Sequence, residues 1–356
     1  MSSERQKSEM PHDNNEHSLG KETGLSSSQI SVQVNDLHRE FQTKEKPVIA
    51  LDGISFEVNE GEIFGVLGPN GAGKTTTIRI LSTLLLPTSG WAKVKGFDVA
   101  TEPEKVRRVI NMASGAEKAG YDFISARTNL WFFSQLYGIP SDEANRRIDD
   151  LSEMLGLTKH LNKKFYALST GYRQRATIAR AFVNEPKVVF LDEPTIGLDV
   201  MTALSIRDFL KIQAKEKGRT IMLATHNMAE AESICDRIAI IDRGKIIAIG
   251  SPDSLKRSLG SPAQIMEVQP VPKALDFLDS IHGVKGYTSS IDNERGLTTI
   301  QVVVEDEDAA ERAIDSVEKS GYKVLSTWRR AATIEEVFVS LVGKGFAERE
   351  QIGENE

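Results

Sequence analysis

The chain has 356 residues, a length that suggests two or three domains, and 40% of them are hydrophobic and 27% charged, as in ordinary globular proteins. Its 44 Lys and Arg residues against 51 Asp and Glu residues leave a net charge of −7, which argues against a general nucleic-acid-binding protein. A single cysteine, Cys235, excludes an internal disulfide and any CxxC metal or redox motif.

Residues 1–29 are polar and lack the apolar core of a secretion signal, so we predict a disordered tail. Further along, no stretch approaches the roughly 18 uninterrupted apolar residues that a membrane-spanning helix needs. We therefore expect that the chain does not itself cross a membrane.

Residues 30–255 show the pattern of an α/β domain with a parallel sheet. From Ile30 onwards the apolar residues alternate or cluster in short runs, which predicts strands leading to a glycine-rich turn and then a helix from about Gly73. Residues 104–166 are predicted to be a mostly helical insertion, because apolar residues recur there every three or four positions. The apolar runs "KVVFLDEP", "TIMLATH" and "RIAIIDRGKIIAIG" then predict further strands, with helices between them.

Residues 263–345 change the pattern to β-α-β-β-α-β, which predicts a small α+β domain of ferredoxin-like fold, closed by an amphipathic helix in "TIEEVFVSLV". The last residues, 346–356, form an acidic tail. No internal repeat is visible, so the chain is expected to contain one nucleotide-binding unit.

The segment "GPNGAGKT" satisfies the phosphate-loop pattern G-x-x-x-x-G-K-[ST], after a predicted strand and before a predicted helix. Its glycines let backbone N–H groups surround a phosphate, Lys74 neutralises phosphate charge, and the Thr75 hydroxyl is offered to Mg²⁺. A purine nucleoside triphosphate is the predicted ligand. The expected binding residues of this loop are Gly68, Pro69, Asn70, Gly71, Ala72, Gly73, Lys74, Thr75 and Thr76.

Two further apolar runs end in polar residues that would meet the phosphate loop at the carboxyl edge of the sheet. In "KVVFLDEP", Asp192 would hold the magnesium and Glu193 would act as general base toward the attacking water. In "TIMLATH", His226 would hydrogen-bond the γ-phosphate. A solvated acidic loop is the alternative for Asp192 and Glu193, and it is disfavoured because the charges follow so directly on apolar residues. A structural histidine is the alternative for His226, and the presence of the other motifs favours function.

A second loop, "LSTGYRQR", also has the small residues and helix start that favour an anion. The ordered set of phosphate loop, this loop, "FLDEP", "GLD" and a strand-end histidine resembles the ATP-binding-cassette (ABC) ATPases, over roughly residues 30–252. The resemblance implies a P-loop NTPase cassette with a helical insertion, followed by the ferredoxin-like domain.

The resemblance also implies a head-to-tail pair of chains with two ATP molecules between them. The loop "LSTGYRQR" corresponds to the signature loop of this family and would contact the nucleotide of the facing subunit. The segment "GLD" would communicate between the two sites. Phe41 would stack on adenine, although a structural role at a strand end is the alternative. The residues implied by the resemblance are Ser169, Thr170, Gly171, Asp199 and Phe41.

Three positions depart from the usual family pattern. Thr170 replaces the second signature glycine and Tyr172 replaces the signature glutamine. The glutamine expected between the two loops is absent, with Ala116 and Glu117 in that region. Ser-Thr-Gly and Glu117 both resemble the drug-efflux and sodium-efflux branch of the family.

We therefore predict the ATP-binding and ATP-hydrolysing subunit of an ABC transporter, a translocase of the exporter type, with ATP and Mg²⁺ as cofactors. Its partners would be a second cassette and a separate membrane permease, with no nucleic acid. It would be cytoplasmic and peripheral on the inner face of the membrane. A soluble ABC ATPase acting on ribosomes or nucleic acid is the alternative, and a cassette that no longer hydrolyses ATP is a weaker one. The C-terminal domain is expected to stabilise a dimer rather than bind a regulatory ligand.

Overall fold

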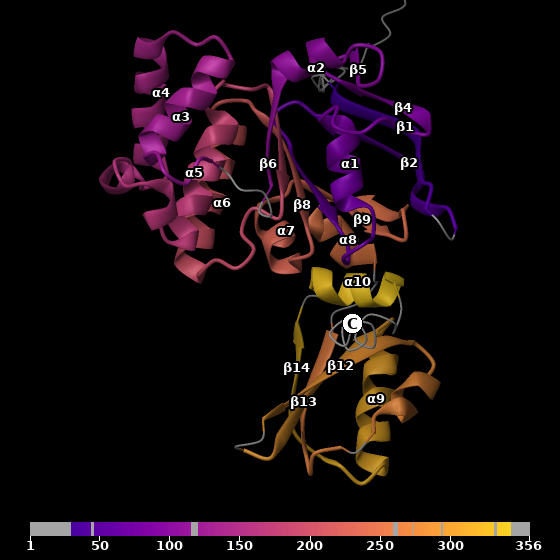
Figure 1. Cartoon of the computed structure of the whole chain (residues 1–356). Helices are drawn as coiled ribbons and strands as arrows, with labels where there is room; N and C mark the ends of the chain where they lie inside the picture. Colours follow the sequence, from indigo (N-terminus) through magenta and orange to yellow (C-terminus); the bar gives the residue numbers. More distant parts are fainter. Residues whose placement is uncertain are drawn as a thin grey trace, which may run out of the picture.

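The computed structural model describes residues 30–43, 46–114, 120–258, 263–272, 274–292, 295–330 and 333–342. The predicted disordered tail at residues 1–29 and the acidic tail at residues 346–356 lie outside these ranges, as do Ala116 and Glu117. Figure 1 shows an upper body that contains two sheets and most of the helices, and a smaller lower body around a third sheet.

A six-stranded, mostly parallel sheet with the order β10-β9-β3-β8-β7-β6 forms the centre of the upper body. Only β10 is antiparallel to its neighbour. Every residue of β3, β7 and β8 is buried, which explains why these strands are continuous apolar runs rather than alternating ones. The strands are β3 (Ile63–Leu67), β6 (Ile110–Ser114), β7 (Val188–Asp192), β8 (Thr220–Thr225), β9 (Arg237–Asp242) and β10 (Lys245–Gly250).

An antiparallel sheet with the order β2-β1-β4-β5 lies beside α1 on one side of the body (Figure 1). Its core is continuous with that of the central sheet, since Phe56 of β2 stacks on Phe64 of β3 with ring centroids 5.2 Å apart. The strands are β1 (Ile30–Phe41), β2 (Val48–Asn59), β4 (Ser89–Val94) and β5 (Phe97–Asp98).

Helices pack around the central sheet, and α3 and α4 extend away from it on the side opposite the antiparallel sheet (Figure 1). Apolar side chains of α3, α4, α5 and α6 share one hydrophobic cluster with β7 and β8. The helices are α1 (Lys74–Leu81), α2 (Pro103–Val109), α3 (Ala126–Leu136), α4 (Ser141–Met154), α5 (Thr170–Phe182), α6 (Val200–Lys215), α7 (Met228–Ile234) and α8 (Pro252–Ser258), with 3₁₀ turns η1 (Thr158–His160) and η2 (Phe165–Ala167).

Two features of this body differ from the sequence-based expectations. The region 104–166 is largely helical, but β6 within it pairs with β7 and forms the edge of the central sheet. A short strand between helical segments is difficult to detect from periodicity. In addition, α1 ends at Leu81 rather than continuing through Leu85, because Thr83 adopts a left-handed φ of 63°.

The lower body is an antiparallel sheet with the order β12-β13-β11-β14, covered on one face by α9. Counted along the chain this is the order 2-3-1-4, which fits the predicted ferredoxin-like arrangement. The predicted first helix is only a 3₁₀ turn, which follows a few residues after Pro270 and Pro272. The elements are β11 (Ala263–Gln269), η3 (Asp276–Ser280), β12 (Val284–Asp292), β13 (Leu297–Val304), α9 (Glu307–Lys319) and β14 (Lys323–Arg330).

The last described helix, α10 (Ile334–Val342), connects the two bodies. Thr333 and Glu336 cap its first turn reciprocally, with the Thr333 N–H donating to Glu336 Oε2 over 2.8 Å. Figure 1 shows α10 below α7 and α8, and its apolar residues belong to the hydrophobic cluster of the upper body. The closing helix therefore completes the core of the large body.

Within the residues that the structure describes, no helix has both the length and the apolar character required to cross a membrane.

Candidate functional site

The glycine-rich loop between β3 and α1 has a backbone that only glycine can supply at two positions. A Cβ on Gly68 would lie 2.2 Å from the carbonyl oxygen of Ile241, which is far inside contact distance. Gly73 has a φ of 111°, and a Cβ there would lie 2.6 Å from the carbonyl oxygen of Ala50. The loop is therefore held tightly against β2 and β9, with the start of α1 and its free N–H groups directly after it.

Lys74, the first residue of α1, turns its side chain back over this loop. Its Nζ donates to the carbonyl oxygens of Gly68, at 2.7 Å, and Pro69, at 3.0 Å, and lies 3.7 Å from Glu193 Oε1. Burial lowers the pKa of the Lys74 ammonium, while the nearby carboxylates Glu193 and Asp192 oppose that shift. A cation that is 5% exposed and held by carbonyl oxygens is well placed to bind a phosphate that enters the loop.

Asp192 ends β7 beside Thr75, whose hydroxyl donates to Asp192 Oδ2 over 2.9 Å. The other oxygen, Oδ1, is buried and has no hydrogen-bond partner among the described residues. Burial also raises the pKa of this carboxyl group. A buried carboxylate oxygen without a donor, next to a hydroxyl, is the type of oxygen pair that binds a hard divalent cation.

Replacing Asp192 by Asn is therefore expected to stabilise the protein in the absence of nucleotide and metal. Because the pKa of the Asp192 carboxyl group is higher in the folded state, its charge destabilises the fold above that pKa and has no effect at low pH, where the group is protonated in both states. We expect a rise in Tm of roughly 2–4 °C at neutral pH, about 1 kcal/mol for a chain of this size. Thermal unfolding measured across a pH series tests this.

Asp199→Asn is the matched control. Hydrogen bonds from the Thr202 N–H and hydroxyl lower the pKa of the Asp199 carboxyl group, so its charge favours the folded state and its replacement brings no gain in Tm at neutral pH. A fall in Tm for Asp192→Asn, or a gain that persists at the lowest pH, would contradict the explanation.

Glu193 and His226 contact each other at the carboxyl edge of the central sheet. Glu193 Oε1 lies 2.8 Å from His226 Nδ1 and accepts the His226 N–H over 3.1 Å. Glu193 adopts a left-handed φ of 52°, which a residue with a side chain rarely adopts, and its N–H donates to the carbonyl of Ala224 on β8. The strained turn directs the carboxylate toward both Lys74 and His226.

Lys74, Thr75, Asp192 and Glu193 line one pocket of about 570 Å³, a volume suitable for a nucleotide. Among the predicted site residues of the described structure, Gly68, Ala72 and His226 do not line it, and His226 reaches the site through its contact with Glu193. The pocket also contains Phe41 from the end of β1, with the Arg39 guanidinium 4.6 Å from its ring centroid. The residues that line the pocket are Phe41, Val48, Ala50, Pro69, Asn70, Gly71, Gly73, Lys74, Thr75, Thr76, Ser114, Asp192, Glu193 and Ile196.

Ser114 is a pocket residue that the sequence patterns do not indicate. It ends β6 and pairs in register with Asp192, the last residue of β7, so the same edge of the sheet positions both. A polar residue at the end of a parallel strand could have indicated Ser114 as a site residue. That strand, however, lies within the region predicted to be helical.

The signature residues lie elsewhere in the chain, and none of them lines this pocket within the described structure. Ser169 precedes the first turn of α5, is exposed, and its hydroxyl does not cap the helix. Thr170 is also exposed, Gly171 is packed so that a Cβ would lie 3.3 Å from Thr202, and Asp199 caps α6. The start of α5, predicted to bind an anion, is therefore presented on the outside of the chain.

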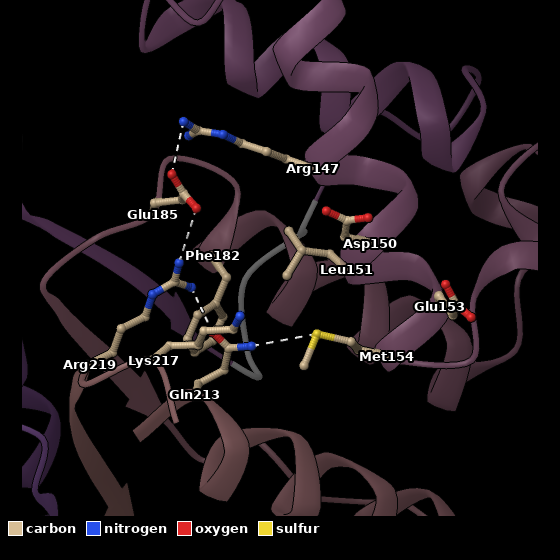
Figure 2. Close-up of a pocket in the computed structure, with 10 residues that line it drawn as sticks. All are labelled: Arg147, Asp150, Leu151, Glu153, Met154, Phe182, Glu185, Gln213, Lys217 and Arg219. Carbon is tan, nitrogen blue, oxygen red and sulfur yellow. Dashed lines mark hydrogen bonds and ion pairs between the residues drawn. The ribbon is translucent and has the colours of Figure 1, made fainter. Parts of the chain in front are cut away.

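A second pocket, of about 550 Å³, lies between α4 and the core (Figure 2). Arg147 on α4 pairs with Glu185 over 2.9 Å, Glu185 lies 3.6 Å from Arg219, and Arg219 donates to Gln213 of α6 over 2.7 Å. These cations are thus engaged by the protein's own groups. We interpret this pocket as a network of ion pairs and hydrogen bonds that attaches α4 to the core, rather than as a nucleotide site.

A parallel sheet whose carboxyl edge combines a glycine-rich loop, a lysine, two carboxylates and a histidine defines a P-loop ATPase. Residues 51–196 match the family model described as ABC transporter. The chain is 38% identical over 227 residues to the ABC transporter ATP-binding protein NatA of Bacillus subtilis, covering 64% of this chain and 92% of that protein. It is 40% identical over 257 residues to the doxorubicin resistance ATP-binding protein DrrA of Mycobacterium tuberculosis, covering 72% of this chain and 75% of that protein.

Solved structures agree with these matches. A dimeric ATP-binding cassette in a post-hydrolysis state, bound to ADP and Pi, superposes with a TM-score of 0.57 at 26% identity, covering 62% of this chain and 98% of that one. The chain belongs to the ABC transporter family and is an ATP-binding, ATP-hydrolysing subunit. The predictions of family, fold class and ATPase activity are confirmed.

Proposed function

We propose that this chain drives export as one of two cassettes that bind head to tail, each supplying its signature loop to the ATP held by the other. The observation that supports this is the position of Ser169 and Thr170, exposed at the start of α5 and absent from the chain's own phosphate pocket. An uncapped helix start favours an anion, and in this arrangement the anion belongs to a neighbouring chain. Gly171 and Asp199 would lie at the same interface.

In the proposed reaction the phosphate loop and Lys74 bind the β- and γ-phosphates, and Phe41 stacks on the adenine. Glu193 acts as general base: His226 holds Oε1 at 2.8 Å, while Oε2, which has a long 3.5 Å contact from the Thr225 hydroxyl, is left to accept a proton from water. His226 would in turn hydrogen-bond the γ-phosphate. Lys74 neutralises the charge that develops on the phosphoryl oxygens as the terminal bond breaks.

Thr75 and Asp192 are the residues that would hold Mg²⁺. They fit this cation because Asp192 has a buried oxygen without a partner in the described structure, and the adjacent Thr75 hydroxyl supplies a second oxygen. The ion would supply charge neutralisation on the β- and γ-phosphates.

Two features support export through a separate membrane permease. The relatives include ATP-binding proteins of doxorubicin, daunorubicin and linearmycin resistance. On this chain, Tyr121, Phe123 and Tyr166 lie next to the helices α3 and α5 and are more than half exposed, with Phe123 at 81%. Exposed aromatic side chains of this kind mark protein interaction sites, and we assign this one to the permease, which would place the chain on the inner face of the membrane.

The test is ATP turnover by the purified chain alone and reconstituted in vesicles with a candidate multi-span permease, sought first among the products of the neighbouring genes. We expect the permease to recruit the chain to vesicles and candidate efflux compounds to stimulate turnover. Phe123→Asp should abolish recruitment and leave basal turnover intact, whereas Leu84→Asp, at another exposed apolar position, should change neither. Binding to ribosomes in place of permease vesicles would overturn the transport proposal.

A further inference from the structure

Glu230 is a buried carboxylate for which the reaction described above provides no role. It lies on α7, four residues after His226, and is 1% exposed. No cation of the described ranges forms an ion pair with it. An ionised carboxyl group in such a position destabilises a protein unless hydrogen bonds compensate it.

The compensating donor is Thr195, whose hydroxyl donates to Glu230 Oε1 over 2.6 Å. Thr195 is 8% exposed and lies two residues after Glu193, in the turn between β7 and α6. The same turn is held at its other side by Gln174 of α5, which donates to the carbonyl of Pro194 over 2.8 Å.

Together with the Glu193–His226 contact, this hydrogen bond closes a ring. One side of the ring is the chain from Glu193 to Thr195, and the other is the chain from His226 to Glu230, with Asn227 capping α7 by accepting the Glu230 N–H. A ring closed at two points permits much less relative movement than one contact alone. This matters at Glu193, because its left-handed backbone conformation is maintained only by its surroundings.

We propose that Glu230 is a positioning residue for ATP hydrolysis: acting through Thr195, it fixes the turn that carries Glu193 and holds the general base in register with His226. This inference rests on the proposed role of Glu193. It assigns a catalytic contribution to a carboxylate that touches neither the nucleotide nor the water.

The test measures ATP turnover, KM for ATP and Tm for four variants of the full chain. Thr195→Val and Glu230→Met each remove the hydrogen bond, and we expect kcat to fall about tenfold with KM within about twofold, since binding groups are untouched. Glu230→Gln keeps an acceptor oxygen for the Thr195 hydroxyl and should retain most of the turnover. Glu232→Gln is the matched control on the same helix, since Glu232 faces Lys256 and α10, and it should leave kcat unchanged.

The double variant Thr195→Val with Glu230→Met separates positioning from stability. Each single replacement leaves one buried polar group without its partner and lowers Tm, while the double replacement removes both groups and restores Tm. We expect kcat to remain low in the double variant, no lower than in either single one. Recovery of kcat together with Tm, or unchanged kcat in the single variants, would overturn the inference.

Failure of the inference is distinguishable from failure of the proposed function. If Glu193→Gln abolishes turnover while the Thr195 and Glu230 variants remain active, only the positioning role is wrong. If Glu193→Gln itself retains full turnover, the general-base assignment is wrong and the inference falls with it.

Discussion

Glu193→Gln is expected to lower ATP turnover by a factor of about 10²–10³ and to trap an ATP-bound dimer, because it removes the general base and leaves the phosphate-binding residues intact. The glutamine can still accept the His226 N–H that Glu193 accepts over 3.1 Å, so the geometry of the site is preserved. Size-exclusion chromatography with ATP and magnesium should show a species of twice the mass, and single-turnover kinetics should show the loss of the chemical step.

A second substitution in the Glu193→Gln background tests the origin of that dimer. Ser169 is exposed at the start of α5, so Ser169→Arg adds bulk to the proposed interface without disturbing the chain's own fold or pocket. We expect the double variant to bind ATP and remain a monomer. A Glu193→Gln chain that stays monomeric with ATP, or a Ser169→Arg dimer that forms normally, would contradict the head-to-tail arrangement.

The sequence predicts those parts of the site in which the local pattern of apolar and polar residues determines where a side chain lies in the fold. A buried parallel strand must place its last residue at the carboxyl edge of the sheet, so Asp192, Glu193 and His226 could be located from the apolar runs that precede them. The phosphate loop could be located because its sequence pattern is specific where it follows a predicted strand and precedes a predicted helix. Asp192 and Glu193 line the same pocket as Lys74, whereas His226 is not among its lining residues and contacts Glu193.

The parts that do not follow from the sequence depend on contacts between distant segments. The hydrogen bond between Thr195 and Glu230 joins residues 35 apart, and no periodicity indicates it. Likewise Ser114 reaches the pocket only because β6 joins the sheet next to β7. The environment of Tyr172 is another such contact, since its ring lies 3.8 Å from that of His160, centroid to centroid, and packs against the main hydrophobic cluster.

The amphipathic pattern of "TIEEVFVSLV" predicts a helix but not its partner. A closing helix after a ferredoxin-like sheet could pack on that sheet alone, and part of α10 does contact β12. The structure instead places its most buried residues in the cluster shared with α7 and α8, and Glu232 of α7 accepts the N–H of Ile334 over 3.4 Å. The C-terminal region is thereby attached to the helix that follows His226.

Phe338→Ala should consequently destabilise the whole chain, although Phe338 lies far from the nucleotide pocket in sequence. Phe338 is fully buried in the main hydrophobic cluster of the upper body. Removing a buried phenylalanine side chain costs about 3–5 kcal/mol, through lost burial and the cavity left behind. Urea unfolding followed by circular dichroism is expected to show a lower midpoint in a single transition that includes the cassette.

Leu341→Ala is the matched control on the same helix, because Leu341 is 38% exposed and its removal leaves no enclosed cavity; we expect a change below about 1 kcal/mol. If Phe338→Ala leaves the midpoint unchanged and only the C-terminal region becomes sensitive to protease, α10 does not belong to the cassette core. If both regions lose stability together, the accessory domain is coupled to the ATPase core through α7, and movement of that helix during the ATP cycle must move the C-terminal sheet with it.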